Sequence, residues 1–250
     1  MKLKKLLNVV RAANGTPDKH FTSAIIAAAG LSTRFGDENK QAVSILDVPV
    51  LIHTLRAYDA SDCIDEIIIV TKKEDVELWR EQCDLFSIKK VKGIVEGGKT
   101  RQESVMCGLE AISDKAKYVA IADGARCLVT PAQITKVCLM AYRTQAACAA
   151  HLISDTVKRA TAIGNVKETV DRTGLWQVQT PQVFHTTLYH AALAKAEADD
   201  FTVTDDASLV EHLGYSVRLV ECGRANIKLT TPADLPLAQA ILNYRAGKKK

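Results

Sequence analysis

The chain has 250 residues, 47% hydrophobic and 25% charged, which is long enough for one large α/β domain or two small ones with a sizeable core. Its net charge of +4 comes partly from lysines near both ends, and no basic run is interleaved with aromatic residues. This composition argues against nucleic-acid binding. No apolar stretch approaches the roughly 20 residues of a membrane span, so we expect no membrane partner.

The seven cysteines are odd in number and form no C-x-x-C pair. They predict buried free thiols in a reducing cytosol, and therefore a cytoplasmic protein. Residues 1–20 are amphipathic and basic, but their apolar part is too short for a signal peptide. We interpret them as an N-terminal appendage, residues 21–245 as a single domain, and residues 246–250 as a basic tail.

The first predicted strand lies in the stretch Ser23 to Gln41. Six small or β-branched apolar residues, Ala24 to Ala29, form an unbroken run typical of a strand buried on both faces. The run stops at Gly30, and a polar loop with Arg34 and Lys40 follows. A glycine that lets backbone N–H groups approach, together with two cations, suits a phosphate ligand. The spacing matches neither common phosphate-loop motif, so an ordinary exit from a strand fits it equally well.

The next elements alternate between helix and strand. The spacing of apolar residues predicts helices over Pro49–Ala60 and Glu74–Phe86, and strands over Glu66–Thr71 and Ile88–Val95. Gly97 and Gly98 then precede a helix, for which Thr100 and Glu103 have the spacing of a capping box. A glycine loop that enters a helix N-terminus is a second favourable place for an anion.

A fourth buried strand, Tyr118 to Ala122, is followed directly by Asp123 to Arg126. The sequence Thr130-Pro131-Ala132-Gln133 predicts a helix start, with Thr130 as the cap, a proline in the first turn and Gln133 as the glutamine of a capping box. Ala146 to Ile153 is another apolar run.

Residues 154–182 are polar and predict a projecting hairpin outside the sheet, with its turn near Gly164-Asn165. A projecting arm with little core of its own needs a partner to cover it. Beyond the arm, the pattern predicts two helices, a strand, a short strand-like segment and a last helix capped by Thr231 to Asp234. The first four are His185–Ala198, Thr204–His212, Ser216–Glu221 and Asn226–Thr230.

This alternation predicts a Rossmann-like α/β fold, with a mostly parallel sheet, helices on both faces and a projecting β-arm. Ligands of such sheets bind beyond the carboxyl ends of the strands. The three loops Gly30–Lys40, Gly97–Ser104 and Asp123–Arg126 all follow such ends, so we expect them to converge on one crevice.

Six ordered blocks now stand out: AAAGLSTRFGDENKQ, EGGKTRQESV, ADGARC, DRTGLWQVQTPQVF, TDDAS and NIKLTTPADL. With these blocks the chain resembles the 2-C-methyl-D-erythritol 4-phosphate cytidylyltransferase family over roughly residues 21–243. The resemblance implies an enzyme that transfers CMP from CTP to methylerythritol phosphate and releases pyrophosphate, with Mg²⁺ or another divalent cation as cofactor. It also implies a homodimer built by the arm.

The resemblance further implies a role for each site residue. Arg34 and Lys40 would stabilise the transition state, while Lys228 and the partner's Arg172 would position the substrate phosphate. Asp123 would hold the metal. The nucleotide would be bound by Ala28, Ala29, Gly30, Gly98, Arg101, Ser104, Asp123 and Arg126, and the second substrate by Thr156, Arg172, Thr180, Thr204 and Lys228. Taken alone, most of these would be solvated loop charges, turn residues or caps.

The sequence departs from the usual family pattern near the site. Asn39 stands where a proline commonly precedes the catalytic lysine, and the preceding segment is about one residue shorter. Ala122 and Cys127 replace a histidine and a proline around the metal-binding aspartate. These changes bear on the rate more than on the fold, and we expect the segment 36–39 to be mobile without CTP.

Three other functions fit parts of the pattern. A ribitol- or pentitol-phosphate cytidylyltransferase would share the fold, CTP and the lysine loop, but the DRTGLWQVQTPQVF block fits the methylerythritol group better. A non-catalytic CTP-binding relative would keep the fold and lose the reaction. A NAD-dependent dehydrogenase fits least, because its glycine spacing is absent.

Overall fold

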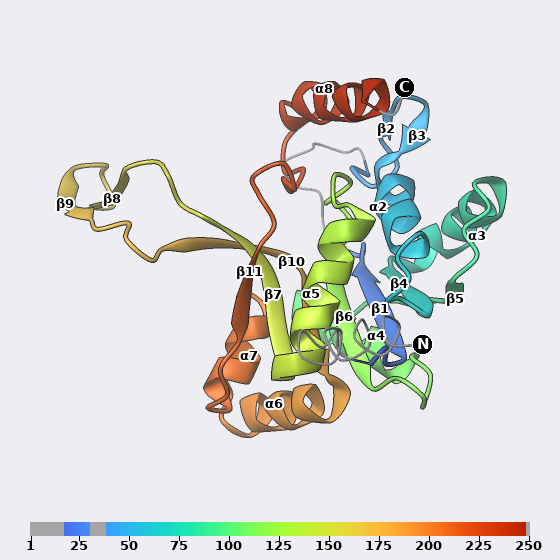
Figure 1. Ribbon diagram of the computed structural model, residues 1–250, viewed down its shortest axis with the longest axis horizontal. Coiled ribbons are helices and arrows are strands. Elements are labelled where there is room, and N and C mark those ends of the chain that lie inside the picture. The colour runs from blue at the N-terminus through green and yellow to red at the C-terminus, as the bar shows by residue number, and fades with distance from the viewer. Residues whose placement is uncertain (1–17, 31–38, 249–250) are drawn as a thin grey trace, which may run out of the picture.

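The computed structural model describes residues 18–30 and 39–248, and its centre is a seven-stranded sheet in the order β11-β7-β10-β6-β1-β4-β5 (Figure 1). Strands β6, β1, β4 and β5 run parallel, whereas β10 is antiparallel to both of its neighbours, β6 and β7. The strands are β1 (Thr22–Ala27), β4 (Glu66–Thr71), β5 (Val91–Glu96), β6 (Tyr118–Asp123), β7 (Ala146–Leu152), β10 (Trp176–His185) and β11 (Arg218–Glu221).

Helices cover both faces of the sheet, which confirms the predicted fold class. One hydrophobic cluster joins a face of the sheet to α2 (Val50–Asp59), α3 (Val76–Leu85) and α5 (Pro131–Thr144). A second cluster joins the opposite face to α4 (Arg101–Glu110), α6 (Thr186–Ala198) and α7 (Asp206–His212). In β1, Ile26 belongs to the first cluster and Ile25 to the second. Burial on both faces explains why Ala24 to Ala27 of this strand are all apolar.

A smaller cluster lies beyond the carboxyl end of the parallel strands. It packs α8 (Asp234–Gly247) against Ile45 of β2 (Ser44–Ile45), a strand that pairs with β3 (Val48–Pro49) in a short hairpin. The predicted cap of this helix is not formed, because its N-cap is Ala233 and no side chain accepts its first N–H groups. The carboxylate of Asp234 instead accepts the backbone N–H groups of the preceding Thr230 and Thr231 at 2.7 and 2.9 Å. The predicted strand Asn226–Thr230 is absent, and this segment lies as an irregular connection whose Leu229 N–H donates to the carbonyl of Ala125.

The two predicted capping boxes both form. The hydroxyl of Thr100 accepts the backbone N–H of Glu103 at the start of α4, and Thr130 accepts that of Gln133 at the start of α5. Each cap stabilises its helix by about 1 kcal/mol. The first cap also fixes the glycine loop that leads into α4.

The arm projects from the body as the hairpin of β8 (Val157–Ala160) and β9 (Val166–Val170), with Gly164 at φ +85° in the turn. Its predicted boundary at residue 182 is wrong, because β10 already pairs with β7 from Trp176 onward. The polar residues Gln179, Thr180 and Gln182 suggested an exposed arm, but they are buried in the sheet. The same strand continues through His185, which was predicted to be helical.

Helix α4 approaches the sheet closely at Gly108. A Cβ placed there would lie 2.5 Å from Cγ2 of Ile25 and 2.8 Å from Cγ2 of Val70. In most helix interiors a change from glycine to alanine gains about 1 kcal/mol. We expect Gly108→Ala instead to lower the free energy of unfolding by about 1 to 3 kcal/mol, because the added methyl group overpacks this contact.

Urea denaturation would measure this effect. Gly247→Ala in α8 is the matched control, since a Cβ there would meet nothing within 4 Å. A gain in stability for both variants would show that helix propensity, and not the close approach to the sheet, dominates at Gly108.

All seven cysteines are free, and all except Cys107 are buried, as the sequence predicts. Among the described helices, none combines the length and apolar character that crossing a membrane requires.

Candidate active site

A cavity of about 400 Å³ opens at the carboxyl ends of the parallel strands β1, β4, β5 and β6. The predicted convergence of three loops is confirmed, because residues from each of them line it. The predicted site residues in this lining are Ala29, Gly30, Lys40, Gly98, Arg101, Ser104, Asp123 and Lys228. Ala28 is not among them: it is buried, and its N–H donates to the carbonyl of Val70 at 2.7 Å.

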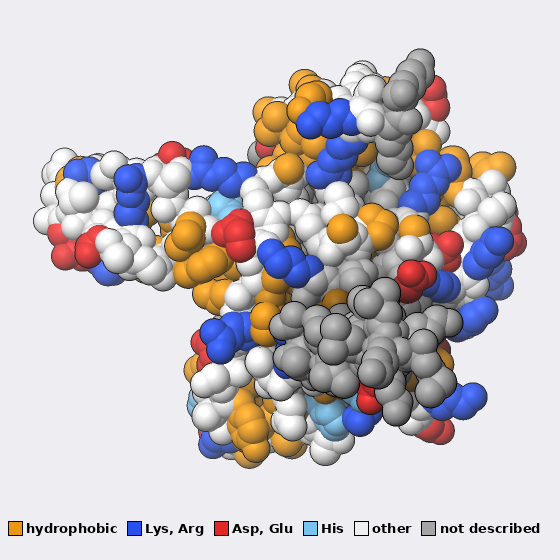
Figure 2. All heavy atoms as spheres, in the orientation of Figure 1, with side chains coloured by type: hydrophobic (Ala, Val, Ile, Leu, Met, Phe, Trp, Pro, Cys, Tyr) orange, Lys and Arg blue, Asp and Glu red, His pale blue; other side chains and the backbone are white. Residues whose placement is uncertain are grey.

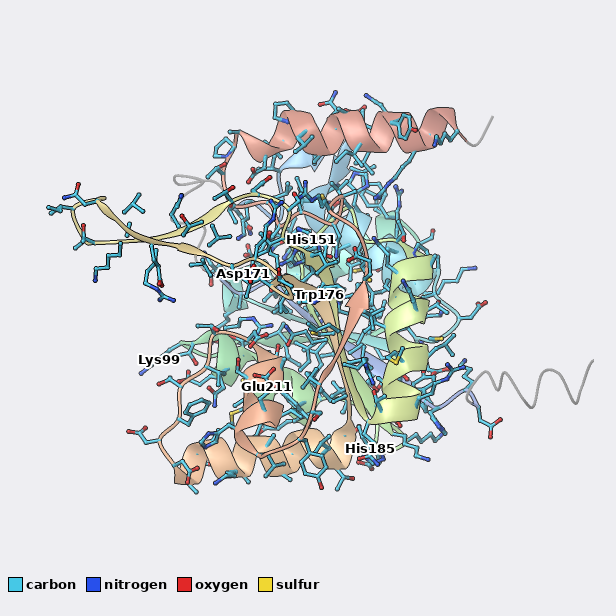
Figure 3. The ribbon with its side chains drawn as sticks, turned by 60° about the vertical axis from the view of Figure 1, so that its left-hand side comes forward. Lys99, His151, Asp171, Trp176, His185 and Glu211 are labelled. Carbon is cyan, nitrogen blue, oxygen red and sulfur yellow. The ribbon has the colours of Figure 1, made fainter. Side chains whose placement is uncertain are left out.

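Sequence reasoning missed several residues of the lining, among them Lys72 and Glu74. Both follow β4, which pairs with β1 in the sheet. Ligands of parallel sheets bind beyond the carboxyl ends of the strands, and this rule applies to β4 as it does to β1. The sequence therefore did contain a signal for Lys72 and Glu74. Lys99, which also lines the cavity, lies exposed at the outer edge of the glycine loop (Figure 3).

The glycine loop is held tightly against the helix that follows it. The carboxylate of Glu103 accepts the backbone N–H of Lys99 at 2.7 Å, and the hydroxyl of Ser104 donates to the carbonyl of Thr100 at 2.9 Å. A Cβ on Gly98 would lie 2.3 Å from Cβ of Glu103. This position therefore requires glycine for close approach rather than for a special φ angle.

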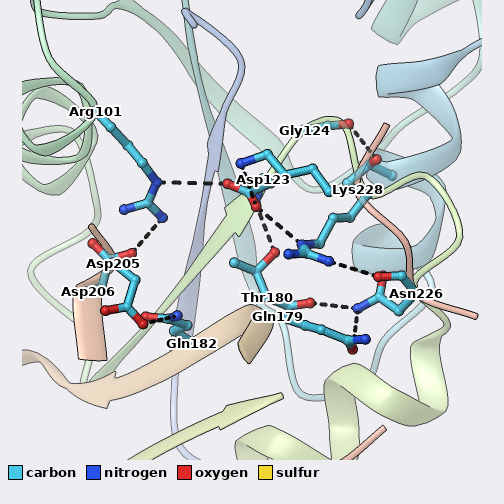
Figure 4. A network of polar contacts seen from close by, with 12 residues as sticks. Arg101, Asp123, Gly124, Gln179, Thr180, Gln182, Asp205, Asp206, Asn226 and Lys228 are labelled. Carbon is cyan, nitrogen blue, oxygen red and sulfur yellow. Dashed lines mark hydrogen bonds and ion pairs between the residues drawn. The ribbon is translucent and has the colours of Figure 1, made fainter. Parts of the chain in front are cut away.

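Asp123 is the electrostatic centre of the site (Figure 4). Its carboxylate lies 3.1 Å from Nζ of Lys228, 3.2 Å from Nε of Arg126 and 3.8 Å from Nε of Arg101. Burial opposes ionisation, but the three cations outweigh it and hold the pKa of Asp123 below its usual value. The side chain is therefore an anion at neutral pH.

Buried polar residues, one from β10 and one from the irregular segment after β11, hold the backbone of Asp123 in place. The hydroxyl of Thr180 accepts the N–H of Asp123 at 3.0 Å, while Asn226 donates to the carbonyl of Thr180 at 2.9 Å. Arg126 donates in turn to the carbonyl of Asn226 at 2.8 Å. Thr180 therefore holds the backbone of the site, a function that the sequence did not indicate (Figure 4).

A second cavity, of about 250 Å³, adjoins the first. Arg101, Asp123 and Lys228 line both cavities. Three further predicted site residues line the second cavity but not the first: Arg126, Thr180 and Thr204. Two ligands bound in these cavities would therefore meet at the same three charged side chains.

The remaining predicted residues lie elsewhere. Thr156 and Arg172 are exposed on the arm and line neither cavity. The arm stands clear of the body, with exposed hydrophobic side chains near its root, among them Leu152 and Val178 (Figure 2). His151 and Trp176, also at this root, belong to the paired strands β7 and β10 (Figure 3). Arg34 and the segment 36–38 lie outside the described residues.

Three departures from the family pattern lie within the described residues, at Asn39, Ala122 and Cys127. Asn39 closes the turn before the cavity, since its side chain donates to Asp75 at 2.8 Å and accepts the N–H of Gln41 at 3.1 Å. Ala122 is buried within β6. Burial raises the pKa of the Cys127 thiol to about 12, so this cysteine is not a reactive thiolate at neutral pH.

The donor set fits a magnesium ion that is shared with a substrate. Within residues 18–30 and 39–248, no three His, Cys, Asp or Glu side chains gather to form an all-protein metal site. Mg²⁺ is commonly held by one or two carboxylates together with phosphate oxygens and water. Asp123, ionised and facing both cavities, meets that requirement for a single carboxylate ligand.

Comparison with known proteins gives one consistent result. Residues 22–244 match the family model described as 2-C-methyl-D-erythritol 4-phosphate cytidylyltransferase. Relatives of that name from Syntrophus aciditrophicus and Halalkalibacterium halodurans are 41% and 43% identical, covering 90% and 88% of this chain and 97% and 96% of theirs. The crystal structure of 4-diphosphocytidyl-2C-methyl-D-erythritol synthase from Anaerococcus prevotii superposes with a TM-score of 0.79 at 31% identity, covering 90% of this chain and all of that one. The chain belongs to the 2-C-methyl-D-erythritol 4-phosphate cytidylyltransferase family.

Proposed function

We propose that this cytidylyltransferase transfers CMP from CTP to 2-C-methyl-D-erythritol 4-phosphate, giving 4-diphosphocytidyl-2-C-methyl-D-erythritol and pyrophosphate. The observation that carries this proposal is the pair of cavities that share Arg101, Asp123 and Lys228. CTP would occupy the larger cavity beside the glycine loop, and the sugar-alcohol phosphate the smaller one. The reacting phosphate groups would then meet at the shared charged residues.

The main barrier to this reaction is electrostatic, because an anionic phosphate must approach a polyanionic triphosphate. Fixed cations aimed at the reacting phosphorus lower that barrier. Lys40 and Arg34 would stabilise charge on the pentacoordinate phosphorus, and Lys228 would orient the incoming phosphate. The nucleophile is already ionised, so no general base is needed. Mg²⁺ bound by Asp123 would neutralise charge on the triphosphate.

A pyrophosphate-release assay with CTP and Mg²⁺ tests the proposal. We expect turnover with methylerythritol phosphate and little with ribitol phosphate. A preference for ribitol phosphate would assign the chain to pentitol-phosphate chemistry, and CTP binding without pyrophosphate release would identify a non-catalytic relative. The family match does not favour either alternative.

We also propose that the arm forms a homodimer and that Arg172 acts on the partner's site. The exposed, polar arm and the hydrophobic side chains near its root support this proposal. The free thiols support a reducing, cytoplasmic compartment.

Arg172→Ala is expected to lower turnover by about 10- to 100-fold, since it removes one positioning cation. If Arg172 acts across a dimer, co-refolding equal amounts of the Arg172→Ala and Lys228→Ala variants should restore about a quarter of the parent activity. Half of the dimers would be mixed, and each mixed dimer would hold one intact site. No recovery despite mixed dimers would place Arg172 and Lys228 of one site on the same protomer.

A further inference from the structure

Asp206 is a buried carboxylate at the start of α7, outside the set of residues that line the two cavities. One of its oxygens lies 2.6 Å from Nη2 of Arg101, and the other accepts the hydroxyl of Tyr189 at 2.8 Å. Its side chain is only 2% exposed, compared with 32% for that of Arg101. Asp206 is therefore a fixed anchor, and Arg101 is the more accessible partner.

Arg101 lies between two carboxylates, and it is much closer to one of them. Its guanidinium is 2.6 Å from Asp206 but 3.8 Å from Oδ1 of Asp123 (Figure 4). Burial disfavours the charged form of Arg101, yet the charge and hydrogen bond of Asp206 outweigh it and raise the pKa of this arginine. The other two cations at Asp123, Lys228 and Arg126, both lie near its second oxygen, Oδ2.

We propose that Asp206 is a positioning residue that holds Arg101 away from Asp123, so that Oδ1 of Asp123 stays available to a divalent cation bound with CTP. This inference rests on the proposed binding of CTP and a divalent cation. Asp206 also balances charge, because the cluster contains three cations, Arg101, Arg126 and Lys228, and two carboxylates. Without the charge of Asp206, the ion pairs that remain to these cations among the described residues are those with Asp123.

The charge balance predicts that removing the charge of Asp206 changes the affinities for a metal ion and for metal-free CTP in different directions. In Asp206→Asn, Arg101 can approach Oδ1 of Asp123, and the net positive charge rises. We expect the dissociation constant of Mn²⁺, measured by electron paramagnetic resonance at saturating CTP without the second substrate, to rise about tenfold. Metal-free CTP, titrated in EDTA by calorimetry, should bind as tightly as in the parent or more tightly. A substitution that only disturbed the fold would weaken the binding of both Mn²⁺ and metal-free CTP.

Matched variants separate charge from packing. Tyr189→Phe removes only the neutral hydrogen bond to Asp206 and should leave both affinities within about twofold of the parent. Asp206→Glu keeps the charge, so its affinity for Mn²⁺ should be much closer to that of the parent than to that of Asp206→Asn. Arg101→Gln removes the cation and should have the opposite effect on the two affinities. Metal-free CTP should bind more weakly than in the parent, while the affinity for Mn²⁺ at saturating CTP should not fall. This last variant carries the test if Asp206→Asn fails to fold.

The inference is overturned if Asp206→Asn weakens both ligands together, if it changes neither, or if the parent binds no Mn²⁺ with CTP. These measurements require no turnover. A failure to use methylerythritol phosphate would therefore contradict the proposed function and leave the result for Asp206 intact.

Discussion

Asp123→Asn is expected to lower turnover by roughly 10²- to 10³-fold, the range found when a group that stabilises transition-state charge is removed. The substitution keeps the shape of the side chain and removes one charge. An amide oxygen binds a hard cation less well than a carboxylate does. It would also leave Lys228, Arg126 and Arg101 facing one another without the anion that now separates them.

The assay is pyrophosphate release at varied Mg²⁺, with Asp114→Asn, on the exposed surface, as the control. If Asp123 holds the metal, saturating Mg²⁺ should recover only a small part of the lost rate. Full recovery of the rate at saturating Mg²⁺ would mean that Asp123 only strengthens metal binding. A parent-like rate in Asp123→Asn would show that Asp123 takes no part in the reaction.

The same residue predicts a pH dependence. Its pKa is lower in the folded state than the roughly 3.9 of an unfolded chain. The group therefore stabilises the fold above that unfolded value, and this contribution is lost as pH falls through the folded pKa. Between pH 8 and 5 the parent should thus lose no activity through protonation of Asp123. Urea denaturation below about pH 4 should show the stability difference between parent and Asp123→Asn shrinking.

Much of the architecture could be predicted because its signals are local. The buried strand Glu66–Thr71 has the predicted bounds, since a fully apolar run bounded by polar residues has few alternatives. The caps at Thr100 and Thr130 depend on side chains three residues apart, a spacing that is visible in the sequence. The edge at which loops converge then follows from the parallel order of the strands.

What the sequence could not predict depends on pairing between distant segments. Strand β10 has the polar residues of an exposed arm because Gln179, Thr180 and Gln182 hydrogen-bond inside the protein rather than to water. Periodicity reports the polarity of a side chain but not its partner. For the same reason the hydrogen bond of Thr180 to the backbone of Asp123, and the ion pair of Arg101 with Asp206, became apparent only in the folded chain.

Lys40→Ala is expected to lower the turnover number by about 10³-fold. Lys40 lines the larger cavity, in a turn closed by hydrogen bonds from Ala42 to the carbonyl of Asn39 and from Gln41 to its side chain. The side-chain amide of Asn39 joins this turn to Asp75, a link that a proline could not make. The lysine therefore sits on an anchored turn, as a group that must meet developing charge requires.

Steady-state kinetics decide which role Lys40 plays. If its charge acts only in the transition state, kcat and kcat/KM should fall together while the KM for CTP changes little. A rise in KM at constant kcat would mean that Lys40 binds the ground-state triphosphate instead. Lys92→Ala, which removes an exposed lysine of β5, controls for the loss of a surface cation. Because Asn39 anchors the turn, Asn39→Ala should lower kcat in the same direction but less, and a parent-like rate in that variant would show that Lys40 is positioned without it.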